Sequence, residues 1–288
     1  MVHPGRWVVR TVRSSASDLA GELRKLAAFF RRDLLVTFSY RLALVRDWVN
    51  LLVQVAVLGF VGRLIPPSAL PRFGGGPVSY LAFVTVGIAV GSFVQLGMQR
   101  VSSGVRSEQL MGTLEAILAT PTNLLTIQVG WVIYDVVYVP LRTLVFLGAM
   151  WLFTDVRLAA TGLLPALVVL VAFIPFVWGL GVLSAAGTMT FRRGAGVGLV
   201  ATLLTISSGA YFPLTVLPPW LRTVAAWNPI ALAVDAMRHA LLGSGGWGEV
   251  GRAVAALIPS AIVTLLLGIL AFRVALRRER RRGTVGLY

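Results

Sequence analysis

Six long apolar segments divide this chain of 288 residues, and they constrain its fold more than any other feature. Crossing a hydrocarbon core of about 30 Å takes roughly 20 residues of α-helix, and lipid leaves backbone groups outside such a helix without hydrogen-bond partners. The segments therefore predict an all-α integral membrane protein with six transmembrane helices. The expected spans are 48–61, which needs flanking residues to reach full length, 78–98, 124–153, 158–190, 197–212 and 254–274.

The composition favours lipid over water as the solvent. Only 13% of the residues are charged and 57% are hydrophobic, whereas a soluble domain carries about 25% charged residues. The net charge of +15 comes from arginines that lie mostly between the apolar runs. Because the chain has no basic stripe with interleaved aromatic residues, the sequence argues against nucleic-acid binding.

Several kinds of reactive site are excluded by residues that the chain lacks. It has no cysteine, so disulfides, cysteine–metal sites and thiol nucleophiles are excluded. Its two histidines, His3 and His239, have no metal-binding spacing, and we expect no metal site. Lys25 is the single lysine, and no Gly-x-x-x-x-Gly-Lys contains it, so the sequence lacks the P-loop that cradles ATP phosphates. We therefore expect no cofactor on this chain.

The placement of the arginines predicts the orientation. Cytoplasmic connections carry an excess of arginine and lysine, which puts both termini in the cytoplasm, as an even number of spans requires. The use of arginine over lysine suggests a GC-rich bacterium, so we expect a multi-pass protein of the bacterial plasma membrane. The chain divides into a cytoplasmic segment at 1–46, a six-helix domain at 47–275 and a basic tail at 276–288. The arginines of the second and fourth connections are Arg100, Arg106, Arg192 and Arg193.

An amphipathic helix is predicted before the first span. Its arginines and Lys25 fall opposite an apolar face, a pattern typical of a helix that lies in the membrane interface. The alternative is an amphipathic helix docked on protein. The apolar face consists of Leu19, Leu23, Leu26, Phe30 and Leu34.

The spans hold few groups that could carry out chemistry. Asp135 and Arg142 lie on one face of the third span, but their separation of seven residues, about 10 Å, is too long for a direct pair. Each is either a functional residue or the partner of another helix, water or a headgroup. Ser207 and Ser208 have no histidine at similar depth to activate them, so the sequence predicts no catalytic residue.

A short amphipathic helix is predicted at about 107–120, in the connection after the second span. Its apolar stripe could dock in a groove of a partner protein, or the helix could lie passively on the membrane. Glu108 and Glu115 share another face, and Pro121 ends the helix. The apolar stripe consists of Leu110, Met111, Leu114, Ile117 and Leu118.

An external segment at about 212–240 is too apolar for a solvated loop, yet its prolines prevent one continuous span. Broken helices at membrane depth are tolerated where protein or a water-lined cavity surrounds them. The sequence therefore predicts a re-entrant helical segment between spans five and six. The prolines are Pro213, Pro218, Pro219 and Pro229.

These two segments, in this order, resemble those of the permease family of type-2 ABC (ATP-binding cassette) exporters, and the resemblance covers nearly the whole chain. In that family a Glu-x-x-x-Gly-Thr-Leu-Glu stretch that ends in Thr-Pro follows the second span, and a Tyr/Phe-Pro…Leu-Pro…Asn-Pro…Arg stretch precedes the sixth. The first stretch matches at Glu108, Gly112, Thr113, Leu114, Glu115, Thr120 and Pro121. The second matches at Tyr211, Pro213, Leu217, Pro218, Leu221, Asn228, Pro229 and Arg238.

The resemblance implies a coupling helix at about 107–120 that contacts a cytoplasmic nucleotide-binding ATPase subunit, which would hold the ATP and Mg²⁺. It also implies pairing with a second permease copy, in a homodimer or a heterodimer, within membrane lipid. A hydrophobic drug-like molecule, a lipid or a lipid-linked glycan would each be an admissible cargo. Two alternatives remain at this point: a secondary transporter that works without an ATPase, and a membrane scaffold that transports nothing.

Overall fold

The computed structural model describes residues 16–64, 78–113, 116–117, 120, 122, 124–154, 156–191, 195–243 and 246–282. These residues are mostly helical and contain no β-strand, which confirms the predicted all-α fold class. The long helices are α1 (Ala16–Ser39), α2 (Arg41–Gly62), α3 (Tyr80–Leu110), α6 (Ile133–Phe153), α7 (Leu163–Phe191) and α11 (Trp247–Arg282). The shorter elements are α5 (Leu124–Gly130), α8 (Ala195–Ser207), α9 (Pro219–Ala226), α10 (Pro229–Leu242) and the 3₁₀ turns η2 (Ala160–Gly162) and η3 (Leu214–Val216).

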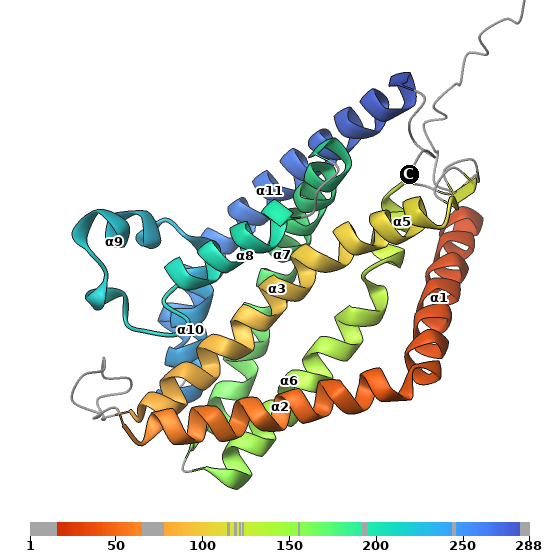
Figure 1. Ribbon diagram of the computed structural model, residues 1–288. Helices are drawn as coiled ribbons and strands as arrows, with labels where there is room; N and C mark the ends of the chain where they lie inside the picture. Colours follow the sequence, from red (N-terminus) through yellow and green to blue (C-terminus); the bar gives the residue numbers. More distant parts are fainter. Residues whose placement is uncertain are drawn as a thin grey trace, which may run out of the picture.

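Helices α3, α7 and α11 form the core of the molecule, with α7 in contact with both of the others (Figure 1). Glycines let these backbones approach closely, as is common between helices in membranes. A Cβ atom on Gly181 of α7 would lie 2.4 Å from the carbonyl oxygen of Gly97 in α3, and one on Gly179 would lie 2.7 Å from the backbone nitrogen of Leu265 in α11. These contacts fix the position of α7 between its two neighbours.

Two apolar clusters define the ends of the bundle. One cluster joins the C-terminal halves of α3, α7 and α11 to α5 through Val105, Ile127, Met189 and Phe272, and Phe29 of α1 packs against it. We call this the arginine-rich end, because α1 and the last turns of α11 carry most of the arginines there. The other cluster joins α2, the start of α3 and the end of α6 at the opposite end.

Among the residues that the structure describes, four helical stretches are long and apolar enough to cross a membrane: Tyr80–Leu110, Thr126–Phe153, Ala160–Thr190 and Trp247–Glu279. They correspond to the second, third, fourth and sixth predicted spans, although a turn at Trp131 and Val132 divides the third into α5 and α6. The first and fifth spans stay predictions. The apolar stretch of α2 is the shorter Trp48–Val61, and α8 has only 13 residues.

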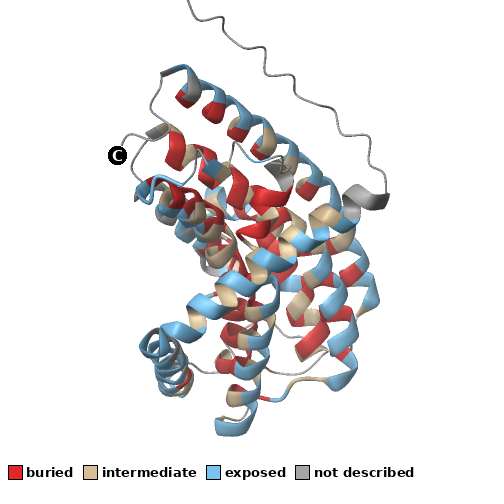
Figure 2. Ribbon diagram, turned by 90° about the vertical axis from the view of Figure 1, so that its right-hand side faces the viewer, coloured by how far each residue is buried: buried red, intermediate tan, exposed pale blue. Residues whose placement is uncertain are grey.

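Helices α1 and α2 lie at the periphery of the bundle. They meet near Tyr40 and diverge, so that α1 lies against the arginine-rich end while α2 runs toward the start of α3 (Figure 1). Buried residues follow the facing sides of the packed helices, and exposed residues cover much of the outer surface (Figure 2). The exposed residues of α2 include the apolar Leu52, Val53, Val57 and Phe60.

Candidate functional site

Asp135, the carboxylate that the sequence places within a span, pairs with an arginine from another helix. It is buried near the start of α6, and its Oδ2 atom lies 2.7 Å from Nε of Arg100 on α3. Arg142, the other predicted intramembrane ionisable residue, lies about two turns further along α6. The sequence placed Arg100 in the connection after the second span, and the structure places it within the helix α3, which continues to Leu110.

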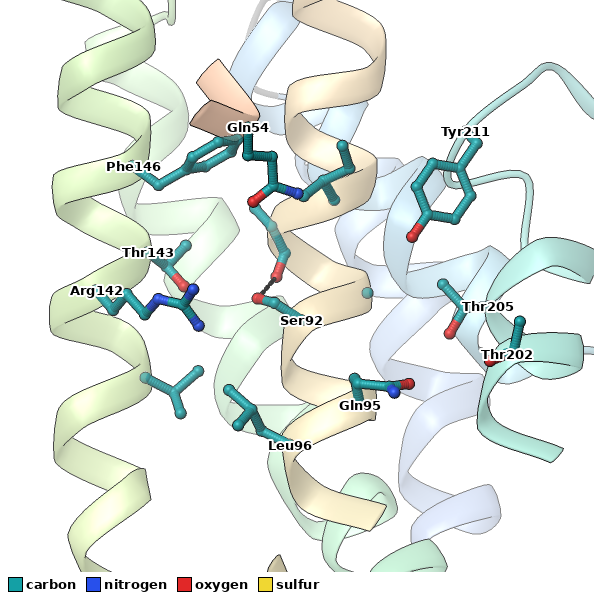
Figure 3. Close-up of a pocket in the computed structure, with 14 residues that line it drawn as sticks. Gln54, Ser92, Gln95, Leu96, Arg142, Thr143, Phe146, Thr202, Thr205 and Tyr211 are labelled. Atoms are coloured by element: carbon teal, nitrogen blue, oxygen red, sulfur yellow. Dashed lines mark hydrogen bonds between the residues drawn. The ribbon is translucent and has the colours of Figure 1, made fainter. Parts of the chain in front are cut away.

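Arg142 instead lines an open cavity of about 350 Å³ between α2, α3, α6 and α8, and its guanidinium points toward α3 (Figure 3). We call this cavity the polar groove. Polar side chains reach it from all four helices, and Tyr211 lies at one end (Figure 3). They are Gln54 of α2, Ser92 and Gln95 of α3, Arg142 and Thr143 of α6, and Thr202 and Thr205 of α8.

Glu108 lies in the last turn of α3 and has a buried carboxylate. Its Oε1 atom accepts a hydrogen bond from Nη1 of Arg32 in α1 at 3.1 Å, and its Oε2 atom accepts one from the Thr113 hydroxyl. The Thr113 backbone N–H also bonds to the Glu108 carbonyl oxygen at 3.0 Å. Between them, Gly112 has a φ of +68°, a conformation that glycine adopts at helix C-termini without steric cost.

The side chains that follow Glu108 are exposed. Leu110 and Met111 each expose 64% of their surface at the arginine-rich end. The described helix boundary differs from the predicted helix at 107–120, because Ser107–Leu110 belong to α3 and a turn follows them. Ile117 packs against the apolar cluster at this end, and Thr120 is exposed. Four predicted coupling residues lie outside the described residues: Leu114, Glu115, Leu118 and Pro121.

Helix α1 packs against α5 and α6, the two helices that together make up the third predicted span. Phe29 lies so close to α5 that a Cβ atom on Gly130 would be 2.6 Å from its ring, and Phe30 packs against Tyr134 of α6 at a centroid distance of 6.0 Å. Hydrogen bonds from Lys25 and from Thr126 of α5 lower the pKa of Glu22. The predicted amphipathic helix therefore rests partly on protein, as the alternative reading of its pattern proposed.

Arg238 of α10 is buried at the opposite end and binds three backbone carbonyls. Its Nη2 atom donates to the carbonyl oxygens of Gly209 and Ala210, each at 2.9 Å, and its Nε atom donates to that of Phe83 at 3.1 Å. The chain between α8 and η3 thereby joins the start of α3. Gly87 permits the contact, since a Cβ atom there would lie 1.9 Å from the Ala210 carbonyl oxygen.

Asn228 ties the same segments from the other side. Its Oδ1 atom accepts the N–H of Ile230 and caps α10, while its Nδ2 atom donates to the Leu204 carbonyl at 3.0 Å and to the Ser207 hydroxyl at 3.1 Å. Pro229 occupies the first turn of α10, where its missing N–H removes no helical hydrogen bond. Asn228 and Pro229 therefore set both the start of α10 and its distance from α8.

The remaining motif residues of the predicted re-entrant segment form its bends. Pro213 and Leu217 are buried at either end of η3, and the exposed Pro218 precedes α9. The Tyr211 carbonyl accepts a hydrogen bond from the Tyr80 hydroxyl at 3.1 Å, which adds a second link to α3. The segment folds as η3, α9 and α10, and α10 packs on α3, α7 and α11. Its depth in the membrane stays a prediction.

Comparison with protein families decides the class of this bundle. The family model described as "ABC-2 type transporter" matches residues 24–242, which include α2–α10, both motif segments and most of α1. The chain belongs to the ABC-2 type transporter family. No curated protein matches the chain. Membership confirms the resemblance inferred from Glu108–Pro121 and Tyr211–Arg238, and it makes this ABC-2 chain the membrane-embedded transport component of its system.

The structure of this ABC-2 protein adds residues that sequence reasoning missed. Arg32 and Arg100 were assigned to the amphipathic helix and to a connection, yet they pair with Glu108 and Asp135. Gln95 of the polar groove was not selected, although an amide in the middle of a span is a recognisable signal. Within the described ranges, no group of three acidic or histidine side chains could hold a metal ion.

Proposed function

We propose that this chain is the membrane-spanning subunit of an ATP-driven exporter, and that a separate polypeptide binds Mg²⁺ and hydrolyses the ATP. The observation that carries the proposal is the tip of α3. Leu110 and Met111 are exposed there, while Glu108, one turn earlier, is buried and held by Arg32 and Thr113. An exposed apolar pair on an anchored helix end suits a groove on a partner protein.

In this proposal the arginine-rich end faces the cytoplasm and the ATPase docks below it. The segment at 107–120 acts as the coupling element, with α3 as its lever. Because α3 is a single helix of 31 residues that packs on α7, a displacement of its tip moves the whole helix. ATP must stabilise one arrangement of the spans over the other, since a partner that binds both equally shifts neither.

A second copy of the permease would complete the pathway, in a homodimer or a heterodimer. In the single chain, apolar side chains on α2 and α6 are exposed, and they include Leu52, Phe60, Leu141 and Leu144. Lipid or a second subunit would cover these faces. A hydrophobic drug-like molecule, a lipid or a lipid-linked glycan are the cargoes that we propose for the assembled pathway.

The proposal is tested at the tip of α3. The double variant Leu110→Asp with Met111→Asp places two charges where the ATPase would dock, and we expect the ATPase subunit that co-purifies with the parent chain to be lost from the purified complex. Leu64→Asp is the matched control, because Leu64 is also exposed, at 76%, but lies at the opposite end. If the double variant retained the ATPase and its transport, the docking assignment would be wrong.

A further inference from the structure

The polar groove is formed by matching stripes on two helices. Its floor is the face of α3 that carries Ile88, Gly91, Ser92 and Gln95, and one wall is the face of α6 that carries Val139, Arg142, Thr143 and Phe146. Both sets follow the spacing i, i+3, i+4, i+7, which places all members on one side of a helix. In the α6 stripe the outer positions are apolar and the central ones, Arg142 and Thr143, are polar. In the α3 stripe Gly91 and Ser92 are central, and Gln95 adds a polar side chain at one outer position (Figure 3).

The polar part of the groove lies halfway along its helices. Gln95 is at the middle of α3 and Arg142 is near the middle of α6, while Gln54 falls near the middle of the apolar stretch Trp48–Val61 of α2. Charged and amide groups at this depth are costly in lipid, and those that occur line cavities or solute paths. Gln54 and Thr202 are exposed, so the groove is open along one side.

Arg142 places a guanidinium group in the groove. Of the fourteen residues drawn around the groove, Arg142 is the one arginine, and none is an aspartate or a glutamate (Figure 3). A guanidinium group binds the oxygens of a phosphate or a carboxylate through paired hydrogen bonds. The amides of Gln54 and Gln95 and the hydroxyl of Ser92 are further donors for such a group.

An apolar pocket adjoins the polar groove. This pocket, of about 140 Å³, is lined mostly by apolar side chains, among them Phe93, Phe173 and Trp178, and the ion pair of Arg100 and Asp135 also borders it. Leu96 and Val139 line both spaces, so the two meet at these side chains. A ligand that filled both would need a charged end and an apolar end.

We propose that the polar groove and the apolar pocket together bind an anionic amphiphile, with its phosphate or carboxylate on Arg142 and its apolar tail against Phe173 and Trp178. This inference rests on the proposed transport function and narrows its cargo to molecules with one acidic group. The same chemistry is present in an acidic lipid and in a soluble fatty acid or acidic drug.

The test is a direct binding measurement on the full chain in nanodiscs of phosphatidylcholine, without ATPase. Tritiated dodecyl phosphate, dodecanoate and the uncharged dodecanol are the probes, with phosphatidic acid and inorganic phosphate as competitors. We expect both anionic probes to bind at least about tenfold more tightly than dodecanol, a difference of about 1.4 kcal/mol. Competition by phosphatidic acid at low mole fraction would identify a lipid as the source, and its failure would identify a soluble amphiphile.

Three variants separate this inference from its rivals. Arg142→Gln should abolish the preference for anions, Arg142→Lys should retain part of it, and Ser92→Phe should weaken all probes because it fills the floor of the groove. Arg157→Gln, an exposed arginine outside the groove, is the matched control and should bind as the parent does. Should Arg142→Gln fail to fold, Arg142→Lys and Ser92→Phe decide the question.

Equal binding of dodecanol and dodecanoate, or an unchanged anion preference in Arg142→Gln, would overturn the inference. Competition by inorganic phosphate as strong as that by dodecyl phosphate would overturn the amphiphile assignment. Since the ATPase is absent from this assay, a negative result leaves the ATP-driven function standing. Loss of the ATPase complex, in turn, would not alter the binding result.

Discussion

Arg100 on α3 and Asp135 on α6 form an ion pair across the core, with 2.7 Å between Nε and Oδ2. The Asp135 side chain is only 6% exposed, whereas that of Arg100 is 41% exposed. The pair therefore holds a buried charge that α6 could not accommodate alone, and it links the start of α6 to α3.

We expect Arg100→Ala to destabilise the protein by about 2–3 kcal/mol, since it leaves the Asp135 charge buried without its partner. The double variant Arg100→Ala with Asp135→Asn should recover most of this loss, because the buried charge is gone. Thermal unfolding in detergent, followed by fluorescence, measures both effects. Additive losses in the double variant would show that the two residues act independently.

At the end of the bundle opposite the arginine-rich end, we expect substitution of Arg238 to destabilise the protein more than substitution of any other arginine. Arg238→Ala removes three hydrogen bonds to buried carbonyls and should cost about 3–5 kcal/mol, with Arg238→Lys intermediate. The matched control is Arg252→Ala, which removes an exposed pair with Glu249 and should cost less than about 1 kcal/mol. The same unfolding assay measures all three variants, and similar losses for Arg238 and Arg252 would contradict the assigned role of Arg238.

Gly87 is expected to tolerate no side chain. Gly87→Ala would push a methyl group into the Ala210 carbonyl, so α3 and the segment after α8 would separate, at a cost of about 1–3 kcal/mol or more. Gly148→Ala in α6 is the control, because a Cβ atom there meets nothing within 4 Å, and it should be neutral or stabilising by up to about 1 kcal/mol. A neutral Gly87→Ala would rule out the close approach.

The pair of Arg32 and Glu108 should control the position of α1. Because Arg32 is 45% exposed, Arg32→Ala should cost only about 1 kcal/mol in stability, yet it removes a direct link from α1 to the tip of α3. The chain has no cysteine, so spin labels on Ala27→Cys and Ser103→Cys report the distance between the two helices. We expect a broader distance distribution for Arg32→Ala and no change for the control Arg31→Ala. An unchanged distribution in both would remove this role from the pair.

The fold class was predictable because apolar length alone decides it. Runs such as 158–190 can be nothing but long helices in lipid, and the structure places α7 there. The helix ends were less predictable. The arginines at 100 and 106 suggested a connection, but α3 continues past them because Arg100 meets Asp135 and Glu108 meets Arg32, pairs that join distant parts of the chain.

For the candidate sites, the sequence predicted which residues of the short motifs matter, but not the distant residues that they contact. Glu108, Asn228 and Arg238 were selected from short motifs, yet their roles depend on partners such as Phe83, which lies 155 residues before Arg238. The stripes of the polar groove were visible within α3 and within α6 as helical spacings. Which two helices face each other is a tertiary property that spacing within one helix does not encode.

Solute flux through proteoliposomes tests the central claim most directly, namely that this membrane protein moves its cargo only when an ATPase drives it. The chain is reconstituted alone and together with an ATPase subunit that co-purifies with it, and fluorescent amphiphiles and drug-like solutes are followed. The account predicts flux only when the ATPase and ATP are both present, and loss of flux in Leu110→Asp with Met111→Asp. Flux by the chain alone under a proton or sodium gradient, without nucleotide, would contradict it.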